Sequence, residues 1–174
     1  MNNNLLIVGA GVYGVVAKEI AKSMNCFEEI AFVDDSPLPN THGNNVIGTI
    51  PDIPALISAY DQIIVAIGTP DVRLDLVTRI EKDFPGHLTT LISPKAYISP
   101  SARIMKGVII EPFAVVHSEC TVSSGCIISA GAVINHASSC LSGVHVDCNA
   151  TVTGNTFVPE KAIIPCGTVF SGTL

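Results

Sequence analysis

The sequence contains no tryptophan, only three tyrosines and few charged residues, which make up 14% of its 174 positions. The shortage of aromatic side chains leaves few platforms on which nucleic-acid bases could stack. Lysine and arginine together number 9 against 15 aspartates and glutamates, so the net charge is −6. Binding to a phosphate backbone requires clustered cationic side chains. We therefore expect no nucleic acid as a partner.

The chain also lacks a long hydrophobic run. Its first apolar stretch, residues 5–17, contains three glycines and is followed by Lys18 and Glu19. This stretch has no basic segment before it, as a secretory signal would, and it is too short to span a bilayer. We expect a cytoplasmic protein without a membrane partner. Hydrophobic residues nevertheless form 48% of the chain, which predicts a large core and excludes extensive disorder.

A six-residue repeat organises the second half of the chain. In steps of six from Ala96 to Thr168, every residue is small or β-branched, and two places later, from Ile98 to Phe170, every residue is apolar. A helix would repeat at about 3.6 residues and an ordinary strand at two. A six-residue unit fits a short strand and a corner, with the small and the apolar residue facing inward. Stacked units share one core, so the pattern predicts a parallel β-helix.

Three such units would close one triangular coil, which brings residues eighteen apart into register about 4.8 Å from each other. One predicted internal column is Ile98, Val116, Ile134, Val152 and Phe170. The residue before each small one often favours a turn, as at Gly107, Gly125, Gly131, Gly143, Asn149, Asn155 and Gly167. These positions are the predicted corners.

The six cysteines have no evident need to form disulfides, because an apolar chain without a secretory signal can build its core from free thiols. We expect buried thiols. His136, Cys140, His145 and Cys148 have a spacing reminiscent of zinc ligands. The repeat, however, directs Cys140 inward and His145 outward, so four ligands cannot converge and no metal is expected.

The first half of the chain alternates strands and helices, which predicts a small parallel α/β sheet. We expect strands at residues 5–8, 30–33 and 63–67, and helices from the glycine-rich turn to Met24 and over residues 53–60 and 72–83. The predicted fold is therefore a Rossmann-like α/β domain over residues 1–90, followed by an all-β domain, the parallel β-helix, over residues 91–174.

A phosphate-binding turn is predicted directly after the first strand. Gly9, Gly11 and Gly14 form a G-x-G-x-x-G pattern whose free amides can meet a phosphate, and Asp34 at the end of the second strand could bind a ribose or base. The domain is about half the size of a full dinucleotide-binding unit, and no domain for hydride transfer follows it. We therefore favour a nucleotide-linked sugar over NAD as its ligand.

The chain resembles the NeuD/PglD-type sugar acyltransferases of the hexapeptide-repeat superfamily over almost its whole length. The segments that carry the resemblance are GAGVYG, FVDD, AIGTPDVR, ISPKAYISPSA and SAGAVINH, in this order. The resemblance implies left-handed winding of the β-helix, acetyl-CoA as co-substrate, and a homotrimer with active sites between neighbouring β-helices. It also implies acetylation of the amino group of a nucleotide-linked sugar, with sialic acid O-acetylation as the alternative.

The same resemblance implies roles for particular residues. His136 is the expected general base, since imidazole titrates near neutral pH; a solvated corner histidine is the alternative. His145 is expected near the acetyl-CoA thioester, and Gly154 and Asn155 beside the pantetheine arm, although surface and turn roles are equally open to them. The expected sugar-nucleotide site consists of Gly9, Gly11, Tyr13, Gly14, Asp34, Asp35, Gly68 and Arg73. For Arg73, the alternative is a solvated charge on a helix.

The chain departs from the family pattern at three places. Ala137 follows His136 where members carry an acidic residue, Tyr13 replaces a histidine common in the glycine loop, and the chain stops at Leu174, before the expected further coils. An acidic neighbour can orient an imidazole and stabilise its charge. A catalytically degenerate homologue that only binds or scaffolds a nucleotide-sugar is therefore a second hypothesis.

Overall fold

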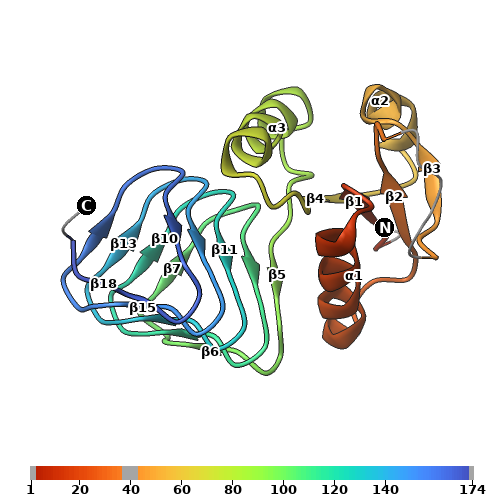
Figure 1. The fold of residues 1–174 in the computed structure, drawn as a ribbon. Helices are drawn as coiled ribbons and strands as arrows, with labels where there is room; N and C mark the ends of the chain where they lie inside the picture. Colours follow the sequence, from red (N-terminus) through yellow and green to blue (C-terminus); the bar gives the residue numbers. More distant parts are fainter. Residues whose placement is uncertain (1–2, 37–42, 173–174) are drawn as a thin grey trace.

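The computed structural model describes residues 3–36 and 43–172, which fold into an α/β layer and a triangular β-helix placed side by side (Figure 1). The α/β layer contains one parallel sheet with strand order β3-β2-β1-β4. Its strands are β1 (Leu5–Val8), β2 (Ile30–Val33), β3 (Val46–Gly48) and β4 (Gln62–Val65). Its helices are α1 (Val12–Met24), η1 (Ile50–Asp52), α2 (Ile53–Leu56) and α3 (Pro70–Asp83). The predicted alternation of strands and helices is confirmed.

Both faces of this sheet are buried, because successive side chains of a strand point to opposite sides. Leu5 and Ile7 pack in a cluster with α1, whereas Leu6 and Val8 pack in a cluster with residues of α2 and α3. The helix predicted to reach Tyr60 ends at Leu56 instead, and the chain turns so that the Tyr60 ring enters the second cluster, where it is buried.

The second half is a parallel β-helix with three flat faces, as the six-residue repeat predicted, and its winding is left-handed, as the family resemblance implied. The first face has the order β17-β14-β11-β8-β5, the second β18-β15-β12-β9-β6 and the third β16-β13-β10-β7. The first face contains β5 (Leu91–Ile92), β8 (Ile109–Ile110), β11 (Ile127–Ile128), β14 (His145–Val146) and β17 (Ile163–Ile164). The second contains β6 (Tyr97–Ile98), β9 (Val115–Val116), β12 (Val133–Ile134), β15 (Thr151–Val152) and β18 (Val169–Phe170). The third contains β7 (Arg103–Ile104), β10 (Thr121–Val122), β13 (Ser139–Cys140) and β16 (Phe157–Val158).

The register and the corners of the β-helix follow the repeat. Ile98, Val116, Ile134, Val152 and Phe170 pair in sequence along the second face, which confirms the predicted column. At every sixth position from Gly107 to Gly167, the backbone has a positive φ, and this series includes all seven predicted turn residues. The corner is therefore a conformational requirement that recurs with the repeat, and glycine and asparagine meet it at the lowest steric cost.

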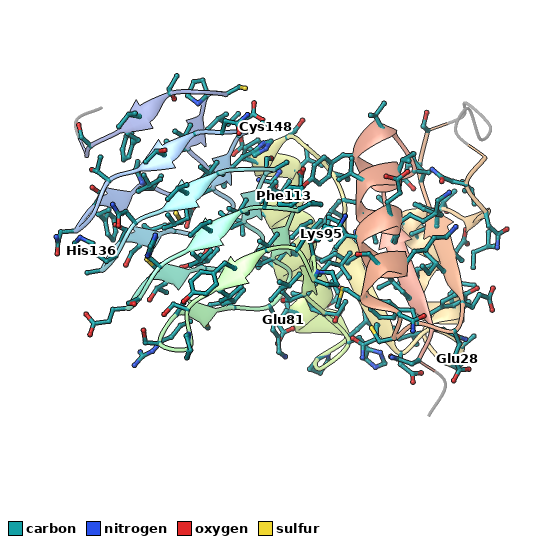
Figure 2. The ribbon with its side chains drawn as sticks, turned by 90° about the horizontal axis from the view of Figure 1, so that it is seen from below. Glu28, Glu81, Lys95, Phe113, His136 and Cys148 are labelled. Carbon is teal, nitrogen blue, oxygen red and sulfur yellow. The ribbon has the colours of Figure 1, made fainter. Side chains whose placement is uncertain are left out.

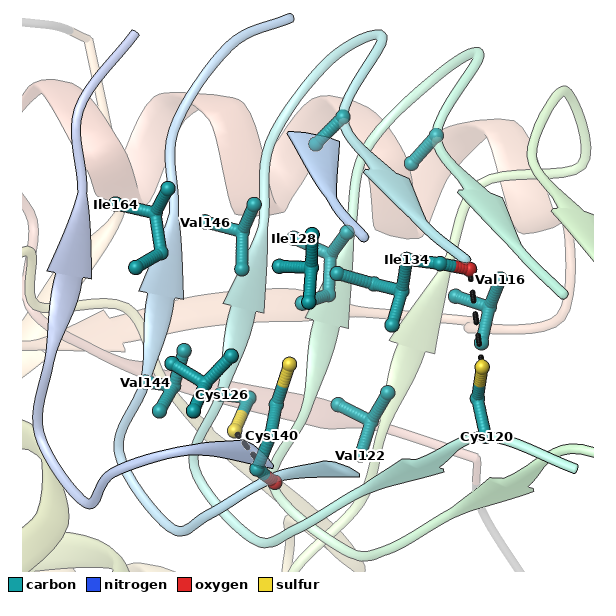
Figure 3. Close-up of a cluster of buried hydrophobic side chains, with 14 of the residues drawn as sticks. Val116, Cys120, Val122, Cys126, Ile128, Ile134, Cys140, Val144, Val146 and Ile164 are labelled. Carbon is teal, nitrogen blue, oxygen red and sulfur yellow. Dashed lines mark hydrogen bonds between the residues drawn. The ribbon is translucent and has the colours of Figure 1, made fainter. Parts of the chain in front are cut away.

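The expectation of buried thiols is correct for three cysteines and wrong for the other three. Cys120, Cys126 and Cys140 lie in the core of the β-helix (Figure 3), whereas Cys148 is half-buried and Cys26 and Cys166 are exposed. The Cys126 thiol donates to the carbonyl of Leu141 over 3.0 Å. The exposed cysteines occupy a loop and a corner, where the repeat places no side chain inside.

The two halves are joined by apolar packing and by α3. Leu91 and Ile109 point out of the first face of the β-helix, yet both are fully buried because Ala17 and Ile20 of α1 pack against them. Helix α3 lies along the neighbouring corner. In the described part of the chain, no helix is both long and apolar enough to cross a membrane.

Candidate functional site

A cavity of about 500 Å³ lies at the carboxyl ends of β1, β2 and β4, where parallel sheets commonly bind ligands. It is lined by six residues predicted to surround a nucleotide-sugar: Gly9, Gly11, Tyr13, Asp34, Asp35 and Gly68. Gly11 is the N-cap of α1, and no side chain caps the helix there. The first amides of α1 can therefore bind an anionic group such as a phosphate.

Two aspartates fix the loops around this cavity. The Ala10 amide donates to Asp34 Oδ2 over 2.6 Å, which ties the glycine loop to the end of β2. The Ile50 amide donates to Asp35 Oδ1 over 2.8 Å, which ties the next loop to the same strand. The second oxygen of Asp34, Oδ1, accepts from the Ser36 amide over 2.7 Å. The sequence predicted both residues in the site, and the structure places both in the cavity wall.

Gly14 does not line the cavity, in contrast to the sequence-based expectation. A Cβ on Gly14 would lie 2.2 Å from the carbonyl oxygen of Gly9 and 3.3 Å from the Phe32 ring. Glycine at this position allows the first turn of α1 to pack against the glycine loop. Its contribution to the site is therefore to set the position of the loop.

The prediction that Arg73 binds the nucleotide-sugar is wrong, and so is the alternative of a solvated helix charge. The side chain is fully buried between α3 and the β-helix. Its guanidinium donates to four backbone carbonyls over 2.6–2.7 Å, those of Ile67, Gly68, Gly125 and Gly143. A guanidinium has five N–H donors, so four of them are occupied within the protein. Arg73 therefore connects the domains.

A polar cluster lies between the glycine loop and the first face of the β-helix. The Tyr13 hydroxyl donates to Glu111 Oε1 over 3.0 Å, and the Ala130 amide donates to Glu111 Oε2 over 3.2 Å. The Tyr13 and His145 rings meet edge to face with centroids 6.4 Å apart. His145 Nε2 lies 3.0 Å from the hydroxyl of Ser129.

Burial determines how this cluster is protonated. Burial, followed by the nearby Glu111 carboxylate, raises the pKa of Tyr13 well above its usual range, so the phenol keeps its proton. Burial, followed by the Arg73 charge, lowers the pKa of His145, although Asp147 acts in the opposite direction. The neutral forms of both side chains are therefore favoured.

Glu111 and Ser129 were not predicted from the sequence. They occupy equivalent positions on successive coils, eighteen residues apart, directly after β8 and β11. This column of polar side chains, which continues to Asp147, is visible in the repeat as an outward position that carries hydrogen-bonding groups. Nothing local in the sequence shows that Tyr13, 98 residues earlier than Glu111, contacts it.

His136 occupies a corner between β12 and β13 and is exposed, as the phase of the repeat predicted. Its carbonyl accepts from the Asn155 amide over 2.9 Å, and its ring lies against Gly154. Gly154 and Asn155, both predicted to contact acetyl-CoA, therefore lie on the next coil beside His136. His145, predicted in the same group, lies on a different face, near Tyr13.

The two halves of the candidate site are separated within one chain. His136 lies at the edge of the β-helix remote from α1, and the described residues that line the glycine-loop cavity all belong to the α/β domain (Figure 2). Within the described residues, no group of three or more histidine, cysteine or acidic side chains could hold a metal ion.

An α/β layer with a glycine-loop cavity, joined to hexapeptide coils, identifies the chain as a two-domain hexapeptide-repeat protein. Residues 4–80 match the PglD N-terminal domain, and residues 101–136 match the bacterial transferase hexapeptide (six repeats). A search of curated protein sequences found no significant match.

Two solved structures extend this comparison over nearly the whole chain. The acetyltransferase domain of PglB from Neisseria gonorrhoeae, in complex with acetyl coenzyme A, is 31% identical, with a TM-score of 0.90 and coverage of 97% of this chain and 82% of that one. A histidine-to-asparagine variant of perosamine N-acetyltransferase from Caulobacter crescentus, in complex with CoA and GDP-perosamine, is 25% identical, with a TM-score of 0.79 and coverage of 98% and 90%. The chain belongs to the PglD-type family of hexapeptide-repeat sugar acetyltransferases.

Proposed function

We propose that this protein transfers the acetyl group of acetyl-CoA to the amino group of a nucleotide-linked sugar. The observation that carries the proposal is the combination of the glycine-loop cavity with an exposed histidine whose ring faces a glycine on the next coil. The cavity, with helix amides at one end and aspartate carboxylates at the other, suits a phosphate attached to a nucleoside. The complexes of the two relatives with acetyl-CoA, CoA and GDP-perosamine support both ligands.

His136 acts as the general base in this proposal. As the sugar nitrogen attacks the thioester carbonyl, a C–N bond forms and the nitrogen must lose a proton, which the imidazole accepts. The tetrahedral intermediate then collapses, the C–S bond breaks, and the proton is delivered to the CoA sulfur. The products are the N-acetylated sugar and free CoA. Among the described residues, no side chain is hydrogen-bonded to the ring of His136, so its nitrogens are accessible to substrate.

Gly154 and Asn155 are the residues on the same corner that would hold the pantetheine arm of acetyl-CoA. Both lie one coil beyond His136, and the Asn155 amide is already engaged by the His136 carbonyl. The backbone of Gly154 lies beside the imidazole, since a Cβ at this position would be 2.7 Å from Cε1 of His136. His145, beside Tyr13 on the other face, would approach the thioester only from a neighbouring copy.

The separation of His136 from the cavity requires a second copy of the chain to complete the site. The second face of the β-helix presents an outward apolar column that suits such a contact, with Tyr97 56% exposed and Val169 69% exposed at its two ends. Exposed apolar strips of this kind commonly form interfaces. A homotrimer, in which each β-helix edge faces the cavity of the next subunit, would bring the base to the sugar.

The first test is an assay of thiol release from acetyl-CoA in the presence of UDP- or GDP-linked amino sugars, with free sialic acid as the O-acetylation alternative. We expect CoA release with an amino-sugar nucleotide and its loss in His136→Ala. His117→Ala is the matched control, because His117 is an exposed histidine on the preceding coil. A folded protein that turns over none of these acceptors would favour the scaffold hypothesis.

The second test addresses the shared site. His136→Ala subunits retain an intact cavity, and subunits altered in the cavity, such as Asp34→Ala, retain His136. Mixed assemblies of two variants that are each inactive should recover part of the activity if neighbouring subunits share one site. Sedimentation as a stable monomer, or no recovery after subunit exchange, would contradict it.

A further inference from the structure

We infer that Glu111 is a positioning residue for the sugar half of the substrate, acting through Tyr13, and that Tyr13 is the residue that determines which sugar fits. This inference rests on the proposed function. It concerns the hydrogen bond that the Tyr13 hydroxyl donates to Glu111 Oε1 over 3.0 Å. Among the described residues, this is the only hydrogen bond between side chains that joins the cavity wall to the β-helix.

Tyr13 belongs to both structures at once. It lies in the first turn of α1 and lines the cavity, while its hydroxyl reaches a residue 98 positions later in the chain. The ring also meets His145 edge to face, with centroids 6.4 Å apart. The hydrogen bond at the hydroxyl and the ring contact with His145 together fix the orientation of the Tyr13 side chain. The wall of the cavity that faces the β-helix is therefore fixed by this ring.

Glu111 is itself immobilised. It is 9% exposed, and its second oxygen accepts from the Ala130 amide over 3.2 Å on the next coil. No lysine or arginine is paired with it among the described residues. A buried carboxylate that lacks a cationic partner is stabilised by its donors, and Tyr13 supplies the one that comes from the other domain. Loss of either partner would leave the other without its donor or acceptor.

The geometry has a consequence for selectivity. The glycine loop binds the phosphate through backbone amides, which are insensitive to the sugar, whereas the Tyr13 ring lies between this loop and the β-helix. The ring forms part of the cavity wall, and its one polar atom, the hydroxyl, is already bonded to Glu111. A group on the sugar that points toward the β-helix must fit against this ring.

The experiment measures equilibrium binding by calorimetry, with GDP and UDP and with GDP-perosamine and a UDP-linked amino sugar as probes. We expect Tyr13→Phe and Glu111→Gln each to weaken binding of the preferred nucleotide-sugar by roughly 5- to 20-fold, and binding of the bare nucleotide by less than about twofold, in line with the loss of one hydrogen bond to a charged group. The double variant should be no weaker than either single one, because both remove the same contact. Tyr13→His should change the ranking of the two nucleotide-sugars.

The matched control is Tyr60→Phe. Tyr60 also donates its hydroxyl to a glutamate, Glu29, over 2.7 Å, but it lies away from the cavity. This variant should lower the melting temperature without altering affinity for any probe. If Tyr13→Phe and Glu111→Gln behave like Tyr60→Phe, the pair is merely structural and the inference is overturned. A wild-type protein that binds no nucleotide-sugar would overturn the proposed function as well, so the two failures are distinguishable.

Discussion

The imidazole of His136 lies against the α-carbon of Gly154, so closely that a Cβ added to Gly154 would be 2.7 Å from Cε1 and 2.8 Å from Nε2 of the ring. Real side chains do not approach this closely. The place of the expected base is therefore determined by a glycine on the next coil, eighteen residues away in sequence.

Gly154→Ala should displace His136 while the coil stays intact. Alanine is compatible with this backbone position, because Ala130 occupies the equivalent place in an earlier repeat. We expect a fall in kcat on the order of 100-fold, the cost typical of a misplaced catalytic group, with little change in melting temperature. Ser142→Ala, at another equivalent corner position, is the control and should retain full activity. Equal activity of both variants would contradict a positioning role for Gly154.

Ala137 has two expected effects, one on stability and one on catalysis, which two substitutions can separate. Its φ of 53° lies in the left-handed region, where alanine is disfavoured, and Asn149 and Asn155 occupy equivalent corners at φ 56°. Ala137→Asn should therefore stabilise the protein by about 1 kcal/mol, measured by urea denaturation. Ala137→Asp should also accelerate CoA release relative to Ala137→Asn, because a carboxylate beside the imidazole stabilises the imidazolium formed during transfer. Equal rates for the two variants would mean that His136 functions without an acidic neighbour.

Arg73 should be among the most costly residues to replace. Arg73→Met removes the donor for four carbonyls at 2.6–2.7 Å, and each of these carbonyls is then left without that partner. We expect a loss of roughly 3–5 kcal/mol in the free energy of unfolding, as for other broken buried networks. Arg79→Ala on the same helix is the control. Arg79 is exposed, and its one ion pair among the described residues is with Asp83 at 3.6 Å, so its loss should cost less than about 0.5 kcal/mol.

The difference between these residues shows what the sequence could predict. The β-helix repeats one requirement every six residues, so its register, its internal columns and the places of its corners were all predictable from phase alone. The glycine loop and Asp34 were predictable because strand, turn and helix are adjacent in sequence. The bonds of Arg73 to Gly125 and Gly143, and of Tyr13 to Glu111, span 52 to 98 residues. They depend on how the domains pack, for which no local pattern exists.

The six thiols should fall into two groups by reactivity. Burial raises the pKa of Cys126 to about 12, and raises those of Cys120 and Cys140 as well, so these thiols carry almost no thiolate at pH 8. Cys26 and Cys166 are exposed and Cys148 is half-buried. Burial also raises the pKa of Cys148. A disulfide reagent should therefore modify Cys26 and Cys166 rapidly in the native protein, Cys148 more slowly, and all six thiols in denaturant. Rapid modification of Cys126 would contradict the packing of the core.

The stability of the protein should depend on pH through His145. Burial, and then repulsion from Arg73, lowers the pKa of this imidazole below its ordinary value of 6.5, while Asp147 partly opposes the shift. Between the lowered pKa and 6.5, the unfolded chain binds more protons at this position than the folded one. The contribution of neutral His145 to stability is therefore complete above pH 6.5 and is lost as the pH falls below that value, until the folded pKa is reached.

The measurement that isolates this effect compares His145→Gln with the wild type by urea denaturation at several pH values between about 5 and 8, the range in which histidine titrates. Glutamine can keep a hydrogen bond to Ser129 but cannot be protonated, so the variant should lose less stability on acidification. His117→Gln, which changes an exposed histidine, is the control for the loss of an imidazole elsewhere on the β-helix. If His145→Gln and the wild type lose stability in parallel, protonation of His145 is not coupled to folding, and the imidazole must be better solvated in the junction than its contacts with Tyr13 and Ser129 indicate.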